Sequence, residues 1–385
     1  MSNNKILPFI VSGQGVFVFK NYKEEVIFSL TNNKNNYLYV KFTDKSISVF
    51  NGNTKETYID IKNNKGLIQN KDAYYWFSLD SQNQILRGGI GEVRLETSTY
   101  EYKFSYKQGE EKYKINKKYL ESLNYVVYDE TIEAINLLKK PVVVNVPLKV
   151  KNTHELTMND IAENRYISHS ILSSTAQKLY NCISGNSFVL NDDDFPDFSK
   201  AIEYSISTPG CWCHEKLKSK SREFNPNQPN IKETYLRITL GENMGNSPGI
   251  PYVLEIWPSE HYSPIHSHAD TDAIIRVLHG EINVNLYPFL SSKKIDPFGV
   301  QVFEKDEVTW ISPELNQIHQ LINKNLGSTC ITIQCYMYNE ENRLHYDYFD
   351  YINEDGKIEK YEPDSDKEFM EFKKLMKKEW LNRKK

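Results

Sequence analysis

The sequence predicts a mainly β protein with two β-domains, a helical segment between them and a helix at the C-terminal end. Short runs of alternating apolar and polar residues, separated by turn-forming clusters, fill residues 5–127 and return over residues 231–352. Between these regions, residues 154–183 and 195–207 have helical patterns. Near the end of the chain an apolar stripe recurs at helical spacing, formed by Phe369, Phe372, Met376 and Trp380.

Residues 1–127 are predicted to form an accessory β-sandwich or jelly roll. Strand-like pairs such as Val16/Val18 and Val26/Phe28 alternate with clusters rich in Asn, Lys and Gly. The run Gly88-Gly89-Ile90-Gly91 is not part of a strand–glycine–helix unit, which a nucleotide-binding loop would need. We therefore interpret these glycines as turn or bulge residues.

Residues 128–190 are predicted to be a helical connector. Within it, Asp129–Lys140 has a helical pattern, and Pro141–Pro147 reads as a linker or edge strand between prolines. Residues 191–385 are predicted to form the second β-domain, with a helical lead-in and a C-terminal helix. Ser365 and Glu368 stand at the spacing of a capping box for that helix.

Composition limits the possible partners. Charged residues make up 25% of the 385 residues and hydrophobic ones 39%, which is typical of a globular protein. The formal net charge of −4 argues against nucleic acid as a partner. No apolar run approaches the roughly 18 residues of a membrane span, so no membrane partner is expected. Five cysteines at irregular spacing predict no disulfide framework and favour a reducing, cytoplasmic location.

Three histidines are the strongest functional signal. His266 and His268 stand two apart, so on a strand both imidazoles point to the same face, and His319 follows on a later strand. Three nitrogen ligands leave coordination positions open, which suits a catalytic metal. Residues 274–282 read as a β-hairpin behind the pair. This arrangement resembles that of a cupin β-barrel; the alternative is a pair of surface histidines on a strand.

Further residues give a more specific resemblance over residues 190–352. Tyr235-Leu236-Arg237, Trp257, His261, Ile265-His266-Ser267-His268, Leu278-His279-Gly280, His319, Asn323 and Tyr336 follow in the order and near the spacing of the cysteine dioxygenase (thiol dioxygenase) family of cupins. A weaker resemblance links Tyr75–Asp80 and Ile85–Gly91 to the module named after farnesoic acid O-methyltransferase.

The resemblance to the thiol dioxygenases implies a set of roles. His266, His268 and His319 would bind Fe(II), and Arg237 would hold the substrate carboxylate. Tyr336 would form a hydrogen bond near the bound thiol and oxygen, and Tyr235, Trp257 and Gln334 would line the substrate site. The residues are chemically suited to these roles, because Arg offers a carboxylate a fixed fork of donors.

Three departures from the family pattern bear on activity. Gln334 stands where the family has the His of a Ser-His-Tyr relay, so proton handling there is altered. Ala273 stands where animal enzymes have the Cys that is crosslinked to the Tyr, so no thioether can form at that pair. Asp270 and Asp272 follow the histidine pair and are alternative fourth ligands.

A second cluster, Cys211-Trp212-Cys213-His214, has the residue types of a zinc site. No second Cys pair lies within reach of the same loop. We expect two free thiols packed around Trp212.

Three functions remain open. The first is oxidation of L-cysteine by O₂ to cysteine sulfinic acid. The second keeps the same chemistry with another thiol, such as 3-mercaptopropionate or a peptide N-terminal cysteine; Arg237 favours free cysteine. The third is a binding or structural protein, in which residues 1–127 recognise a protein or glycan partner and the cupin is a scaffold with weak or no turnover.

Overall fold

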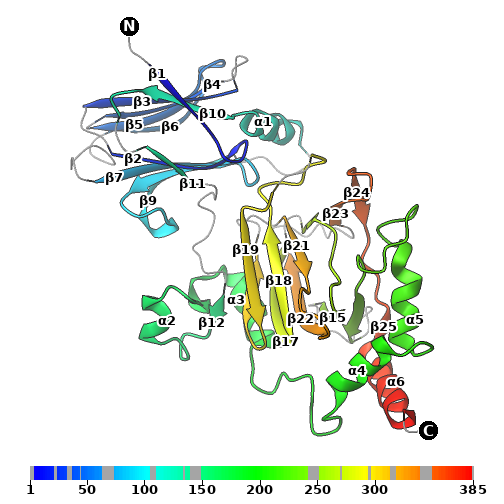
Figure 1. Cartoon of the computed structure of the whole chain (residues 1–385). Helices are drawn as coiled ribbons and strands as arrows, with labels where there is room; N and C mark the ends of the chain where they lie inside the picture. The colour runs from blue at the N-terminus through cyan, green and yellow to red at the C-terminus, as the bar shows by residue number, and fades with distance from the viewer. Residues whose placement is uncertain are drawn as a thin grey trace. The chain divides into compact units, whose positions relative to one another are not determined.

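The computed structural model describes residues 4–20, 24–32, 37–43, 45–62, 73–104, 110–132, 135–138, 149–241, 251–268, 271–293, 296–312, 318–338 and 349–383. Its chain divides into two compact units, Met1–Asn145 and Val146–Lys385, and each is described by itself (Figure 1). The predicted mainly β class, with a C-terminal helix, is confirmed.

Unit 1 contains two antiparallel sheets that form a sandwich (Figure 1). The six-stranded sheet has the order β1 (Asn4–Pro8), β10 (Tyr125–Asp129), β3 (Glu25–Thr31), β4 (Tyr37–Thr43), β5 (Ser46–Asn51) and β6 (Thr57–Lys62). The five-stranded sheet has the order β11 (Asn136–Leu138), β2 (Gln14–Lys20), β7 (Tyr74–Asp80), β8 (Ile85–Ile90) and β9 (Ser98–Lys103). A 3₁₀ turn, η1 (Leu95–Thr97), precedes β9.

Aromatic rings from both sheets fill the core of the sandwich. The rings of Phe17 on β2 and Phe28 on β3 lie 4.6 Å apart between centroids, and both side chains are fully buried. Gly88 and Gly89 lie at a bulge in the β8–β9 pairing, as the sequence predicted. A Cβ on Gly88 would lie 1.8 Å from the hydroxyl of Tyr100, so only glycine fits there.

Two predictions for unit 1 are wrong. A helix, α1 (Glu111–Glu121), interrupts the region expected to be entirely β. Its many Lys and Glu residues are good helix formers, but it buries only Leu120, so its apolar period is faint. The expected helix at Asp129–Lys140 instead includes the end of β10 and the edge strand β11, because Leu137 pairs with Phe17 across the sheet. The segment Pro141–Pro147 lies outside the described residues.

Unit 2 also contains two sheets. The larger has the order β13 (Ile167–Ser168), β12 (Val150–Lys151), β20 (Val308–Ile311), β17 (Thr271–His279), β22 (Cys330–Tyr338), β15 (Tyr252–Trp257), β14 (Leu236–Leu240) and β25 (Lys367–Glu368). The smaller has the order β19 (Gly299–Glu304), β18 (Glu281–Leu286), β21 (His319–Ile322), β16 (His266–Ser267), β23 (Phe349–Ile352) and β24 (Ile358–Tyr361). Side chains from both sheets meet in the space between them, which is called the lumen below.

The predicted hairpin at residues 274–282 does not form. Strand β17 belongs to the larger sheet and β18 to the smaller one, so the chain crosses between the sheets at Gly280. Gly280 has a φ of +72°, and a Cβ there would lie 2.5 Å from the backbone oxygen of Thr329. Only glycine fits at this corner between the two sheets. The sequence pattern had predicted a tight turn within one sheet instead.

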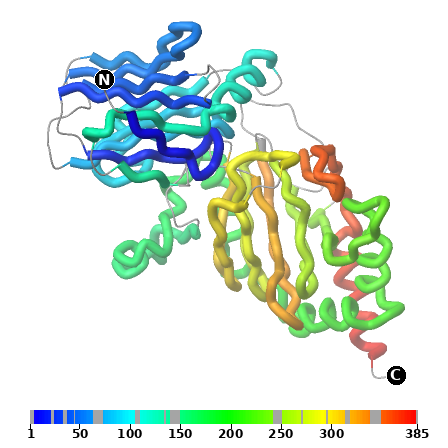
Figure 2. The backbone as a smooth tube through the Cα atoms, turned by 45° about the horizontal axis from the view of Figure 1, so that its top comes forward, coloured from blue at the N-terminus to red at the C-terminus, as the bar shows by residue number. Residues whose placement is uncertain are grey.

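Helices of unit 2 pack on strands of the larger sheet. The helices of this unit are α2 (Met158–Ala162), α3 (Ser174–Ile183), α4 (Phe198–Ser207), α5 (Trp212–Ser219) and α6 (Phe369–Asn382), with 3₁₀ turns η2 (His169–Ile171) and η3 (Lys220–Arg222). Helix α3 packs on β17 and β22, and α6 lies beside α4 (Figure 2). The stripe on α6 buries Phe372 and Met376 completely, as expected. Its cap differs from the prediction, because Glu368 itself is the N-cap and accepts from Met370 N and Glu371 N.

The helical connector expected at 128–190 is divided between the units. Its first part, through β11, pairs with the sandwich, whereas β12 pairs with β20 of unit 2. The helical pattern at 154–183 resolves into α2, η2 and α3, with β13 between α2 and η2. None of the helices in the described ranges is both long and apolar enough to span a membrane.

Candidate metal centre

The three predicted histidines meet in the lumen. His266 on β16 lies directly opposite His319 on β21, and His268 follows β16 by one residue. One nitrogen of each ring lies within 4.8 Å of the others. Within the described ranges, this is the one group of three or more His, Cys, Asp or Glu side chains with the spacing of a metal site.

The ring orientations fit a shared metal ion. His266 Nδ1 lies 2.9 Å from the carbonyl oxygen of Pro264, which can only accept, so Nδ1 carries the hydrogen and Nε2 presents its lone pair. That Nε2 lies 3.0 Å from Nε2 of His268. Two nitrogens each about 2.1 Å from one ion, at a right angle, are about 3 Å apart. All three side chains are buried.

Burial favours the neutral form of the His266 and His268 imidazoles, the form in which histidine binds a metal. Desolvation lowers the pKa of His266 from 6.5 to about 4, against a hydrogen bond to Pro264 that raises it. Desolvation also lowers the pKa of His268 well below its ordinary value, and the neighbouring His266 and His319 add to this effect. At neutral pH the rings of His266 and His268 therefore each have a lone pair available.

The lowered pKa values predict a pH-dependent stability of the metal-free protein. The unfolded chain takes up protons near pH 6.5, whereas folded His266 resists protonation until about pH 4. The free energy of unfolding should therefore decrease as the pH falls through that window. Denaturant titrations in a chelator at several pH values measure this slope. His266→Gln should reduce the slope of the unfolding free energy against pH. Equal slopes for the wild-type protein and this variant would contradict the lowered pKa of His266.

Tyr336 faces the histidines from the opposite sheet. Its ring stacks on His268, with 5.9 Å between the ring centroids. Ala273 on β17 lies directly opposite Tyr336 on β22, so the residue that would carry a crosslinking thiol has only a methyl group. Apolar side chains of Val253, Ile275 and Ile311 surround this pair. The Tyr336 phenol is buried, and desolvation raises its pKa, so it stays protonated.

A polar row runs from Tyr336 across the larger sheet. The Tyr336 hydroxyl donates to Oε1 of Gln334, and Gln334 Nε2 donates to Oε2 of Glu255. The other Glu255 oxygen accepts from Arg237 at 2.5 Å. The row thus joins Tyr336, Gln334, Glu255 and Arg237, all of which are buried. Gln334 joins Tyr336 to Glu255 because its one side-chain amide has both an accepting oxygen and a donating nitrogen.

Glu255 is the residue that sequence reasoning missed. It lies on β15 between Arg237 of β14 and Thr332 of β22, in one cross-strand row. A signal was present, because Glu255 is the one charged residue in the otherwise apolar and aromatic run of β15. The carboxylate of Glu255 is paired with the guanidinium of Arg237, which was expected to hold a substrate carboxylate. That role of Arg237 stays a prediction, since a substrate would have to compete with Glu255.

Tyr235 and Trp257 lie beside this row as a stacked pair. Their ring centroids are 4.2 Å apart, and both are buried. Trp257 Nε1 donates to Thr332 Oγ1 at 3.4 Å. The pair forms an aromatic wall next to Arg237, and its contact with substrate stays a prediction.

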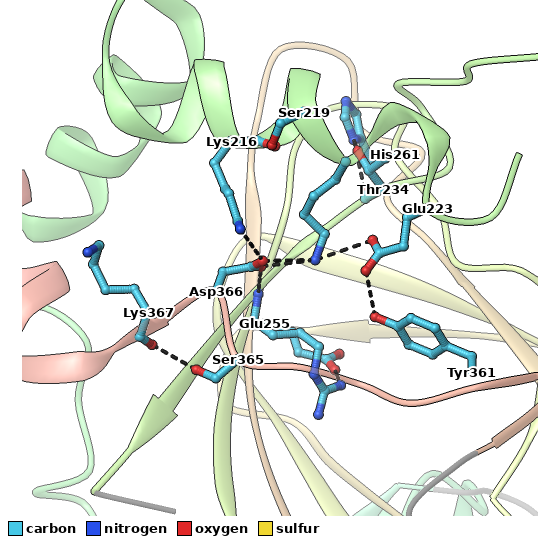
Figure 3. A network of polar contacts seen from close by, with 12 residues as sticks. Lys216, Ser219, Glu223, Thr234, Glu255, His261, Tyr361, Ser365, Asp366 and Lys367 are labelled. Carbon is cyan, nitrogen blue, oxygen red and sulfur yellow. Dashed lines mark hydrogen bonds and ion pairs between the residues drawn. The ribbon is translucent and has the colours of Figure 1, made fainter. Parts of the chain in front are cut away.

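An ion-pair network holds the strand of Arg237 from outside the barrel (Figure 3). Asp366 Oδ2 accepts from the backbone N–H of Arg237 at 2.8 Å. Asp366 also pairs with Lys216 at 3.3 Å and Lys220 at 3.0 Å. Lys220 reaches Glu223 as well, at 3.3 Å. The segment between β24 and α6 is therefore fixed to β14 at the position of Arg237.

The alternative ligand sites do not join the centre. Asp272 is buried, and its carboxylate accepts from Ser173 at 3.0 Å, away from the three histidines; Asp270 lies outside the described residues. Cys211 precedes α5, and Cys213 is buried against Met376 with 3.8 Å between the sulfurs. All five cysteines are free thiols.

Comparison with known proteins finds distant likeness to solved structures. No family model matches the chain. Similar solved structures include the cupin domain of Schizosaccharomyces pombe Cnp3, at 11% identity and a TM-score of 0.22, covering 27% of this chain and 65% of that one. An oxalate oxidase in complex with glycolate has 18% identity and a TM-score of 0.23, covering 30% and 54%. The chain thus spans less than two thirds of these two.

A cupin superfamily protein from Desulfitobacterium hafniense has 13% identity and a TM-score of 0.21, covering 28% of this chain and 81% of that one. At such low identities and TM-scores, the fold of unit 2 has to be assigned from the arrangement of its own strands. Two sheets, with a His-x-His pair and a later histidine between them, agree with the cupin β-barrel expected from the sequence. Unit 2 is a cupin-type barrel with a candidate three-histidine metal centre.

All residues of this centre come from unit 2, which predicts that unit 1 contributes no ligand. A shortened chain, Val146–Lys385, should bind as much metal as the full chain. The cut lies beyond β11, since a cut near Asp129 would separate that strand from β2. Metal content after dialysis measures the outcome. A folded shortened chain without metal would show that unit 1 completes the site.

Proposed function

We propose that this chain is an iron(II)-dependent thiol dioxygenase, which converts a small thiol and O₂ to a sulfinic acid. L-Cysteine is the first substrate to test, and another small thiol is the alternative. In this reaction both oxygen atoms bond to sulfur and the thiol hydrogen is retained on the sulfinic acid. Sulfur is oxidised and dioxygen is reduced, so no other co-substrate is needed.

One observation supports the proposal above all others. A protonated phenol, Tyr336, stacks against the ligand candidate His268, and its hydroxyl is fixed by Gln334. A neutral three-histidine set leaves a ferrous ion with its positive charge and open positions, which supply Lewis acidity and redox chemistry for a thiolate and O₂. Carboxylate-rich sites would instead neutralise the ion.

The residues of the chain have separate tasks in this proposal. His266, His268 and His319 bind the ion, and Pro264 orients His266 through Nδ1. Tyr336 would donate or hold a proton at its hydroxyl, next to where thiol and oxygen would react. Gln334 orients that hydroxyl but cannot itself exchange a proton near neutral pH. The apolar side chains of Val253, Ile275 and Ile311 exclude water.

The test is oxygen consumption by the iron-loaded full chain with a panel of thiols. We expect thiol-dependent uptake of oxygen that stops when the iron is removed by a chelator. Oxygen uptake slower than in a relative with a complete Ser-His-Tyr relay would agree with the proposal, because Gln334 stands in place of the relay His and cannot exchange a proton. Iron-loaded protein that consumes no oxygen with any thiol would favour the binding-scaffold alternative, in which unit 1 recognises a protein or glycan.

A further inference from the structure

A second cavity lies on the outer face of the larger sheet of unit 2. Its volume is about 530 Å³, which is within the range of small-molecule sites. Arg276 of β17 lines this cavity, whereas the neighbouring Ile275 packs with Tyr336 in the lumen. Successive side chains of a strand point to opposite faces, so the sheet itself separates the cavity from the candidate metal centre. Residues from the segment 184–191, which follows α3, supply another wall.

Arg276 is a fixed part of the cavity wall. Its Nη1 donates to the carbonyl oxygens of Ile183 at 2.7 Å and Gly185 at 3.0 Å, at the C-terminal end of α3. Its Nη2 donates to Asp306 at 2.9 Å, and its side chain is only 7% exposed. The Nε–H of Arg276 has no acceptor within the part of the chain that the structure describes. The guanidinium is therefore held rigidly and keeps a donor for an added acceptor.

The formal charges of the side chains that line the cavity cancel when histidine is counted as neutral. The cations are Lys151, Arg276 and Lys305, and the anions are Glu155, Asp306 and Glu307. Besides the pair of Arg276 with Asp306, Lys151 lies 3.0 Å from Asp160, and Glu307 lies 2.6 Å from Lys149. An anionic ligand would lie beside carboxylates, and a cationic ligand beside ammonium and guanidinium groups. Neither therefore gains from the net charge of the lining.

Hydroxyl groups can form hydrogen bonds with charged side chains of both signs. A hydroxyl donates one hydrogen bond and accepts others, so it can pair with a carboxylate on one side and with an ammonium or guanidinium group on the other. The hydroxyl of Ser184 and the exposed amide of Asn186 add neutral donors and acceptors. Tyr180 and Phe188 add aromatic rings. The lining thus suits a pyranose, which has a rim of hydroxyls and a face of C–H groups that packs on aromatic rings.

We propose that this outer cavity binds a neutral sugar, either a free sugar or the terminal residue of a glycan. The site is separate from the metal centre, so the inference does not depend on the proposed dioxygenase function. A bound pyranose places hydroxyl oxygens toward Arg276 and Lys305, and hydroxyl hydrogens toward Glu155 and Glu307. A uronic acid or an amino sugar of the same shape adds a charge that the lining does not balance.

Saturation-transfer NMR titrations of the full chain with D-glucose, D-galactose and D-mannose test the proposal. At least one of these sugars should bind with a Kd of about 10 mM or tighter, and binding by none of them would overturn the proposal. The sugar that binds best is then compared with its uronate and with its 2-amino counterpart. Each charged form should bind about tenfold or more weakly. A charged form that binds as tightly as the neutral sugar would also overturn the proposal.

The methyl α- and β-glycosides of the same sugar distinguish the two sources of the ligand. If one methyl glycoside binds as tightly as the free sugar, the cavity accepts the terminal residue of a glycan. If both methyl glycosides bind about tenfold more weakly, the ligand is a free sugar. Both outcomes support the sugar site.

Asn186→Trp tests where the sugar binds. Asn186 is exposed and lines the cavity, so the larger side chain should fill the cavity without disturbing the fold, and the affinity should fall about tenfold or more. Glu155→Ala, at another exposed position of the lining, should also weaken binding. Asn181→Trp is the matched control, because Asn181 on α3 is exposed but does not line the cavity, and it should bind the sugar as the wild-type protein does. Undiminished binding by folded Asn186→Trp would place the sugar elsewhere, such as in unit 1, and would overturn the proposal.

Discussion

Replacing His268 by alanine is expected to remove most of the bound metal from the protein. The variant leaves two imidazoles, His266 and His319, and opens a space where the ring of Tyr336 had its stacking partner. Loss of one of three ligands removes a metal–nitrogen bond and the pre-arranged geometry of the set. Iron content after reconstitution and gel filtration measures the effect, with near-complete loss expected.

His279→Ala is the matched control for that variant. His279 is the last residue of β17 in the larger sheet; its Nε2 lies 3.1 Å from Glu203, and it is outside the three-histidine cluster. It should retain the metal content of the wild-type protein. If the His268→Ala variant bound a full complement of metal, His268 would not be a ligand.

Tyr336→Phe is expected to lower thiol-dependent oxygen consumption by about tenfold or more, because it removes a fixed hydrogen-bonding group beside the reacting atoms. The ring, and with it the stacking on His268, is retained, so metal content should not change. The loss should appear mainly in kcat. Steady-state oxygen-electrode kinetics with metal content determined on the same sample provide the measurement.

Tyr166→Phe is the control for loss of a tyrosine hydroxyl that donates to a side chain, here at a half-buried position. Tyr166 donates to Glu307 at 2.9 Å, outside the lumen, and desolvation raises its pKa to about 12. Its removal should leave turnover unchanged. If Tyr336→Phe were equally active, Tyr336 would serve only as packing between the sheets.

The parts of the site that follow from strand periodicity were predictable. A His-x-His pair on one face, a later histidine and a tyrosine on a polar face of β22 require only the alternation of side chains in strands. The structure brings His266, His268 and His319 together and places Tyr336 against them. The position of Ala273 opposite Tyr336 agrees with the missing crosslink.

The parts that depend on which strands become neighbours were not predictable. The pattern around Gly280 is that of a hairpin, and only the pairing of β17 and β18 with other strands makes it a corner between sheets. Leu137 lies in the edge strand β11 because this segment pairs with β2, although its sequence has a helical pattern. The role of Glu255 depends on its pairing with Arg237, which lies eighteen residues earlier in the sequence and directly opposite on the neighbouring strand.

Labelled oxygen tests the central claim most directly. Iron-loaded wild-type protein is supplied with ¹⁸O₂ and a thiol, and the product is analysed by mass spectrometry. A thiol dioxygenase at this centre predicts a sulfinic acid in which both oxygen atoms carry the label, formed by wild-type protein and absent with His268→Ala. A product oxidised without label, or formed equally by His268→Ala, would contradict the account.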